Sequence, residues 1–143
     1  EMSKVPFSRQ VVVLRRNNSY DKDLLAYTSN SLLLTFKECT PHHLTNTLAG
    51  KKQDTLFIQA TNAPMHGESL QEFLPALKDY SGNFFELGYS KLSSLYYFAQ
   101  KKGLKTLDGK TMLLSQALAS QEYWWGRSAS FDEVALTLEK ELN

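Results

Sequence analysis

The sequence has little cysteine, no long apolar run and almost no net charge, and each absence excludes a class of protein. The single cysteine, Cys39, cannot form a disulfide within the chain, which excludes a disulfide-stapled secreted scaffold and predicts a reducing, cytoplasmic compartment. The longest apolar runs, such as residues 11–14, are far shorter than the roughly 18 residues that a membrane-spanning helix needs. A formal net charge of +1 over 143 residues gives no general attraction to nucleic acid or anionic lipid, and we expect neither partner.

Two kinds of ligand-binding motif are also missing from the sequence. The seven glycines are scattered, and none lies in a G-x-G-x-x-G loop, the pattern that cradles the pyrophosphate of a dinucleotide. His42 and His43 are adjacent and have no third ligand at a suitable spacing, so we predict no metal site.

Short apolar and β-branched runs alternate with helix-like segments along the whole chain. The runs that we expect to form strands are residues 11–14, 32–36, 55–58, 83–87 and 105–107. The segments that we expect to be helical or amphipathic are residues 19–30, 40–50, 69–78, 92–102, 111–125 and 130–142. This alternation predicts βαβ units and an α/β fold with a mostly parallel sheet flanked by helices.

Ligands of such folds bind beyond the carboxyl ends of the strands. The segments at those ends, and therefore the candidates for function, are residues 15–19, 61–67, 88–91 and 108–112. Residues 15–19 begin with paired arginines, Arg15 and Arg16, which suit a phosphate group or are ordinary solvated charges.

Two of these segments resemble motifs of the shikimate dehydrogenase family. Residues 58–65, I-Q-A-T-N-A-P-M, resemble the family's I-N-A-T-P-x-G-M, and residues 107–117, L-D-G-K-T-M-L-L-S-Q-A, resemble its I-D-G-x-x-M-L-x-x-Q-A. Between them, residues 86–89, E-L-G-Y, stand where the family has D-L-V-Y. The order and spacing agree from about residue 11 to residue 126.

The resemblance implies an oxidoreductase of aromatic amino acid biosynthesis that interconverts 3-dehydroshikimate and shikimate with NADP(H). Members of the family have an N-terminal substrate domain and a C-terminal nucleotide-binding domain. Residues 1–143 would be a single Rossmann-like NADP-binding portion of such an enzyme, an incomplete three-layer sandwich.

The resemblance also assigns roles to the cofactor-binding residues. Arg16 falls where the family holds the adenosine 2′-phosphate, and Arg15 adds a second positive charge. The remaining cofactor-binding candidates are Thr61 and Met65 in one loop, and Gly109 and Met112 at the start of the penultimate helix.

Two further residues correspond to the family's substrate contacts, Tyr89 and Gln116. Gln116 lies one helical turn after Met112, so the two side chains share a face; the alternative is an ordinary exposed glutamine. The substrate would be a small molecule of the shikimate or quinate type. No catalytic residue is assigned, because the family's catalytic lysine and aspartate lie in the absent substrate domain.

Several positions depart from the family pattern. Gln59 replaces an asparagine, Asn62 a proline, Pro64 a glycine and Gly88 a branched apolar residue. The change at Pro64 matters most, because proline fixes φ and removes a backbone donor where glycine lets a ligand approach.

The central strand of the family's sheet, which precedes the Gly-rich loop, has no counterpart in this sequence. We therefore expect two open strand edges. Two hypotheses follow: the chain is the C-terminal part of an enzyme, completed by an N-terminal segment or a second chain, or it is a degenerate non-catalytic module for protein interaction or regulation. We further expect Trp124 and Trp125 to pack against the sheet, and Lys101 and Lys102 to be solvated.

Overall fold

The computed structural model describes residues 10–15, 33–52 and 54–141. All five apolar runs form strands, as predicted, with ends that differ by one or two residues. They are β1 (Gln10–Arg15), β2 (Leu33–Glu38), β3 (Leu56–Gln59), β4 (Asn83–Glu86) and β5 (Thr106–Leu107). The helix predicted at residues 19–30 lies outside the described residues.

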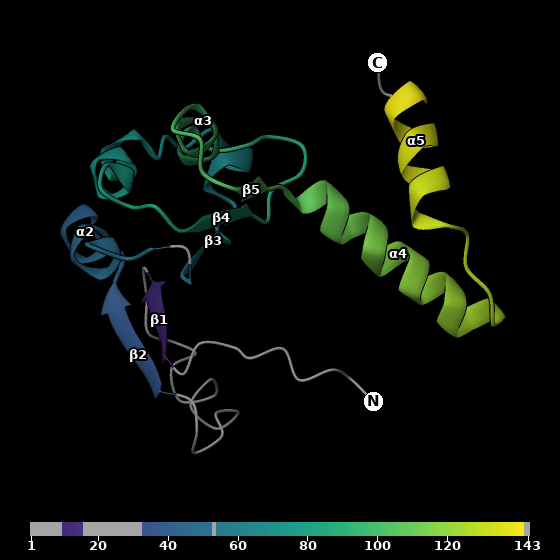
Figure 1. Ribbon diagram of the computed structural model, residues 1–143, viewed down its shortest axis with the longest axis horizontal. Helices are drawn as coiled ribbons and strands as arrows, with labels where there is room; N and C mark the ends of the chain where they lie inside the picture. Colours follow the sequence, from purple (N-terminus) through teal and green to yellow (C-terminus); the bar gives the residue numbers. More distant parts are fainter. Residues whose placement is uncertain (1–9, 16–32, 53, 142–143) are drawn as a thin grey trace.

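The strands pair in parallel and form two separate sheets. One sheet has the order β1-β2 and the other the order β3-β4-β5 (Figure 1). The α/β class and the parallel pairing are confirmed. Within the described ranges β1 and β3 each pair on one side only, so the two edges predicted to be open, on either side of the expected central strand, are both present.

Six helical segments follow the strands in the described part of the chain. They are α2 (Pro41–Leu48), the 3₁₀ segments η1 (Ala63–His66) and η2 (Gln71–Leu77), α3 (Ser94–Lys101), α4 (Gly109–Trp125) and α5 (Phe131–Glu141). Of the segment predicted at residues 69–78, Gln71–Leu77 form the 3₁₀ helix η2 with Pro75 inside it, and proline is incompatible with the hydrogen bonding of an α-helix interior.

Capping side chains explain where the helices begin. The Thr40 hydroxyl accepts a hydrogen bond from the His43 N–H at 3.2 Å, with Pro41 at the first helical position, as predicted. α3 starts later than predicted because Ser93 caps it, and α4 starts earlier because Asp108 does. The predicted boundaries were therefore wrong by two residues at each of these two starts.

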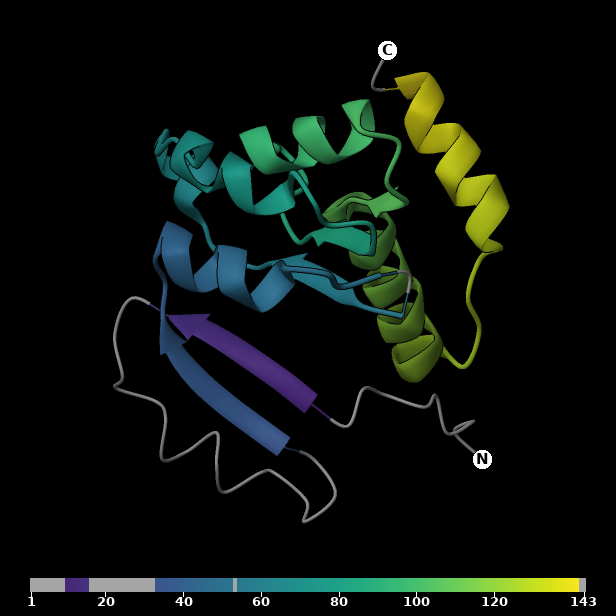
Figure 2. The same ribbon diagram turned by 60° about the vertical axis from the view of Figure 1, so that its left-hand side comes forward.

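The core lies between one face of the β3-β4-β5 sheet and the layer formed by α2, η2 and α3 (Figure 2). Its members are apolar residues at helical and strand spacing: Leu44, Leu48, Ala63, Leu70, Phe73, Ala76, Leu77, Tyr80, Phe84, Leu95, Tyr96 and Ala99. The rings of Phe57 and Phe84 pack edge to face across the β3–β4 pair, with their centroids 5.1 Å apart. This contact places both side chains on the face of the sheet that is turned toward the core.

The opposite face of the same sheet is not covered by the residues that the structure describes. Leu56, Ile58 and Leu107, which alternate with the inward-facing residues, are about half exposed. The third layer of the predicted sandwich is therefore not formed by the described part of the chain.

The helices α4 and α5 form a hairpin at the edge of the molecule (Figure 1). Gly109 is the one buried residue of α4, and Trp124 and Trp125 are 68% and 66% exposed. The prediction that these tryptophans pack against the sheet was wrong, because α4 leaves the sheet at its first turn. The two rings contact each other edge to face, with centroids 6.1 Å apart.

Lys101 and Lys102 are exposed, as predicted, and the ammonium group of Lys102 also has three hydrogen-bond partners. Its Nζ donates to the carbonyl oxygens of Leu77 at 2.7 Å, Lys78 at 2.6 Å and Tyr80 at 2.5 Å. These carbonyls belong to the last turn of η2 and the residues after it, where backbone acceptors have no helical partner. Lys102 thus ties α3 to η2 on the covered side of the sheet.

Candidate functional site

The carboxyl ends of β3 and β4 meet the start of α4 at one edge of the sheet. The Leu87 N–H donates to the Gln59 carbonyl at 2.9 Å, and the Gly109 N–H donates to the Gly88 carbonyl at 3.0 Å. These bonds bring together three of the four predicted segments, residues 61–67, 88–91 and 108–112. Of the fourth segment, residue 15 ends β1, while Arg16 lies outside the described residues.

The loop after β3 is held by the side chain of Gln59. Its Oε1 accepts from the Thr61 N–H at 2.7 Å, and its Nε2 donates to the Thr61 carbonyl at 3.3 Å. The side chain of Thr61 stays exposed, and Met65 in η1 is 52% exposed. Both predicted cofactor-binding residues are therefore accessible to a ligand at this edge.

Pro64 is accommodated in this loop without distortion of its neighbours. It stands in the first turn of η1, where the backbone N–H of a helix has no partner to lose. The left-handed position is taken by Gly67, with φ of 76°, and its N–H donates to the Pro64 carbonyl at 3.1 Å. The left-handed backbone conformation that glycine permits therefore occurs at Gly67, three residues after the position of the motif's glycine.

Gly109 is buried directly against the backbone of the loop after β4. A Cβ at this position would meet the Leu87 carbonyl oxygen in a clash, with the Leu87 carbonyl carbon at 2.8 Å and the Gly88 carbonyl oxygen at 3.0 Å. The preceding residue, Asp108, accepts a hydrogen bond from the Lys110 N–H at 3.0 Å and caps α4. The D-G pair therefore joins α4 to the β4 loop, and its role beside a cofactor remains a prediction.

Of three further predicted residues, one lies in a loop at this edge and two lie on α4, which begins there. Tyr89, in the loop after β4, is 46% exposed. Met112 is half-buried and Gln116 exposed on α4, one turn apart on the same side of the helix, as predicted.

One residue at this edge was not assigned a role by the sequence, the fully buried Glu86. Its Oε1 accepts from Gln59 Nε2 at 3.1 Å, and its Oε2 accepts from Ser93 Oγ at 2.5 Å. Burial raises the pKa of Glu86, and hydrogen bonds from Ser93, Gly88 and Gln59 partly oppose that rise. The signal in the sequence was the polar residue at the end of each of two adjacent apolar strands, Gln59 and Glu86, which are register partners.

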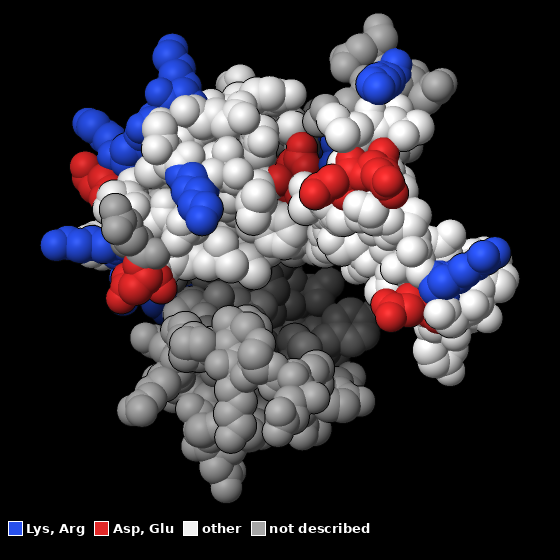
Figure 3. Space-filling model, turned by 45° about the vertical axis from the view of Figure 1, so that its right-hand side comes forward, with Lys and Arg blue, Asp and Glu red and all other residues white. Residues whose placement is uncertain are grey.

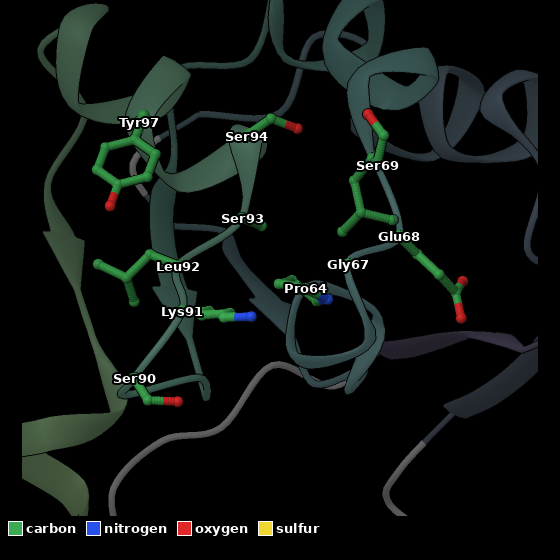
Figure 4. A pocket seen from close by; sticks show the side chains of 11 residues that line it. Pro64, Gly67, Glu68, Ser69, Ser90, Lys91, Leu92, Ser93, Ser94 and Tyr97 are labelled. Carbon is green, nitrogen blue, oxygen red and sulfur yellow. The ribbon is translucent and has the colours of Figure 1, made fainter.

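A pocket of about 390 Å³ lies beside this edge, between the loop after η1 and the start of α3 (Figure 4). Its walls carry hydroxyl groups, one amine and one carboxylate, from Glu68, Ser69, Ser90, Lys91, Ser93, Ser94 and Tyr97. None of the sequence-predicted residues lines it, so the pocket and the predicted cofactor site are neighbours that share only the two loops.

The described ranges offer no other prominent site. Among these residues there is no group of three or more His, Cys, Asp or Glu side chains able to hold a metal ion. On the face in Figure 3, the described basic side chains lie among acidic and uncharged ones. No described helix is both long enough and apolar enough to cross a membrane.

The fold and this edge define an α/β protein of parallel strands whose candidate ligand-binding loops follow β3 and β4. No family model matches the chain. The shikimate dehydrogenase (NADP(+)) of Streptococcus mutans is 36% identical over 92 residues, which are 59% of this chain and 30% of that protein. The shikimate dehydrogenase (NADP(+)) of Leptospira interrogans is 29% identical over 137 residues, which are 92% of this chain and 45% of that protein.

A solved structure agrees with these sequence matches. The shikimate 5-dehydrogenase of Listeria monocytogenes, in complex with shikimate and NAD, matches 90% of this chain and 47% of its own, with a TM-score of 0.69 and 18% identity. The chain spans less than half the length of each of these three proteins. The chain is thus distantly similar in sequence to shikimate dehydrogenases, and it shares the fold of part of the solved structure.

Proposed function

We propose that residues 1–143 are the C-terminal, NADP-binding portion of a shikimate dehydrogenase-like oxidoreductase that acts on 3-dehydroshikimate and shikimate. The observation that supports this most is the placement of the D-G-x-x-M-L-x-x-Q-A segment. It opens α4 at the point where the loops of β3 and β4 meet, so Met112 and Gln116 extend from the same edge as Tyr89. The cytoplasmic location is part of this proposal.

The residues of the chain fit one end of the cofactor. Thr61, Met65, Gly109 and Met112 would hold the nicotinamide end, and Tyr89 and Gln116 the substrate beside it. When bound, the nicotinamide would supply a hydride to the carbonyl carbon of 3-dehydroshikimate, or accept one from the corresponding alcohol carbon of shikimate. Arg15 and Arg16 would bind the 2′-phosphate, and the pyrophosphate has no Gly-rich loop in residues 1–143.

The sheet indicates where the rest of the enzyme would pack. β1 and β3 each have one edge that is unpaired within the described ranges. Leu56, Ile58 and Leu107 form an exposed apolar face on the β3-β4-β5 sheet. We infer that an N-terminal segment or a second chain supplies a strand and a covering layer here, together with the phosphate loop and the catalytic residues.

The second candidate function is a non-catalytic module for protein interaction or regulation. The missing phosphate loop and the exposed Trp124 and Trp125 favour it. The replacement of the motif's glycine by Pro64 does not favour it, because Pro64 fits in the first turn of η1.

A titration with NADPH separates the two functions. The complete natural polypeptide that contains residues 1–143 should quench or shift NADPH fluorescence with saturation in the micromolar range, on the order of 8 kcal/mol of binding free energy. Residues 1–143 alone should bind at least about tenfold more weakly, because the pyrophosphate contacts are missing. Absence of binding by the complete polypeptide would support the non-catalytic module instead.

A further inference from the structure

The carboxyl group of Glu86 joins three segments of the chain. It accepts hydrogen bonds from the Gln59 side chain at the end of β3 and from the Ser93 side chain at the start of α3, and it lies itself at the end of β4. Gln59 in turn holds the loop after β3 through both backbone groups of Thr61. The two loops of the candidate site are thus connected through one buried carboxyl group.

Gly88 is fitted to this carboxyl group. A Cβ at position 88 would lie 3.2 Å from Glu86 Oε1 and 3.1 Å from the Lys91 carbonyl oxygen, tighter than ordinary van der Waals contact. The neighbour on one side is backbone, and the neighbour on the other is a carboxyl group held by hydrogen bonds from the Gln59 and Ser93 side chains. The carboxyl group cannot move away from position 88 without straining these two bonds.

Three departures from the motif therefore coincide in space. Gln59 and Glu86 are each one methylene longer than the motif's asparagine and aspartate, and they contact each other. Gly88, beside the longer carboxyl side chain, is smaller than the motif's branched residue.

We propose that Gln59, Glu86 and Gly88 form one coupled positioning unit that fixes the conformation of both loops at the candidate site. In this unit the longer side chain of Glu86 occupies space that a side chain at position 88 would need. Gln59 bonds both to the Glu86 carboxyl group and to the backbone of Thr61, so the position of the carboxyl group fixes the loop after β3. The unit concerns loop geometry alone, so it stands or falls independently of whether the protein binds NADP.

A double-mutant cycle in the full chain tests the coupling. Gly88→Ala should increase the unfolding equilibrium constant about tenfold when Glu86 is present, since overpacking must displace a bonded group. Glu86→Asp withdraws the carboxyl group from position 88 and leaves the contact with the Lys91 carbonyl oxygen, so in that background Gly88→Ala should have an effect at least about threefold smaller. Equal effects of Gly88→Ala in both backgrounds would overturn the proposal.

Hydrogen exchange gives a second measurement that holds even where a double variant is too unstable. Glu86→Gln replaces one of the two acceptor oxygens by an NH₂ group, so the bonds from Gln59 and Ser93 cannot both be kept in place. Amide exchange should then increase at least about fivefold in both loops, residues 60–67 and 87–93. Glu72→Gln, a matched change at an exposed glutamate of η2, should alter neither loop. Faster exchange in residues 87–93 alone would refute the link through Gln59.

The pH dependence of stability shows whether Glu86 acts through its ionisable carboxyl group or only by filling space. Gln59, Ser93 and the Gly88 N–H face the carboxyl group, and no charged side chain contributes to its shift. Because the folded pKa is raised above the ordinary 4.5, stabilisation by Glu86 is complete below that value and declines as pH rises through the folded pKa. The stability of native protein relative to Glu86→Gln should fall over this window, and a pH-independent difference would contradict the role of the carboxyl group.

Discussion

Replacing Gly109 by alanine should lower the free energy of unfolding by about 2–4 kcal/mol, as measured by urea denaturation followed by circular dichroism. The new Cβ would clash with the Leu87 carbonyl, whose carbon lies at 2.8 Å, and would push away the Gly88 carbonyl that accepts the Gly109 N–H. The start of α4 would then separate from the loop after β4. This loss would also move Met112 and Gln116 away from the candidate site.

Gly50→Ala is the matched control for this change. Gly50 has φ of 68° and open space where a Cβ would stand, so alanine there should cost only about 1 kcal/mol of backbone strain. If Gly109→Ala costs no more than Gly50→Ala, the close contact between α4 and the β4 loop is not what requires glycine.

The second large effect concerns the choice of nucleotide. In the complete natural polypeptide, Arg16→Ala should weaken NADPH binding by about 10–100-fold and leave NADH binding within about threefold. The reason is that a guanidinium group pairs with the 2′-phosphate, which NADH lacks. Equilibrium titration of each nucleotide measures the two effects.

Arg127→Ala is the control for a general change in charge. Arg127 is exposed beyond the end of α4, and its removal should weaken NADPH and NADH binding equally and slightly. Equal large losses of both nucleotides in Arg16→Ala would refute the 2′-phosphate role.

The strands and their parallel order could be predicted because their signal is local. Runs such as residues 11–14 and 55–58 are apolar and short, and they alternate with segments at helical spacing. The predicted starts of α3 and α4 were less accurate, because the capping roles of Ser93 and Asp108 became visible only in the structure. The surroundings of Trp124 and Lys102 depend on which elements pack together, which periodicity does not encode.

The candidate site was predictable to the extent that it follows the motifs. The sequence placed Thr61, Tyr89 and Gly109 in segments that the structure brings to one edge of the sheet. It gave no role to Glu86, because the interest of that residue arises from its pairing with Gln59 across two strands. It also overstated the effect of Pro64, since the conformation of η1 was needed to see that proline fits there.

The most direct test of the proposed function is an assay of NADP⁺-dependent shikimate oxidation by the complete natural polypeptide that contains residues 1–143. The account predicts an increase in absorbance at the wavelength of NADPH that requires both shikimate and NADP⁺, and that falls at least about tenfold in Gln116→Ala, where a hydrogen bond to substrate is lost. If a polypeptide shown to be folded forms no NADPH at saturating concentrations of NADP⁺ and shikimate, the proposed function is wrong.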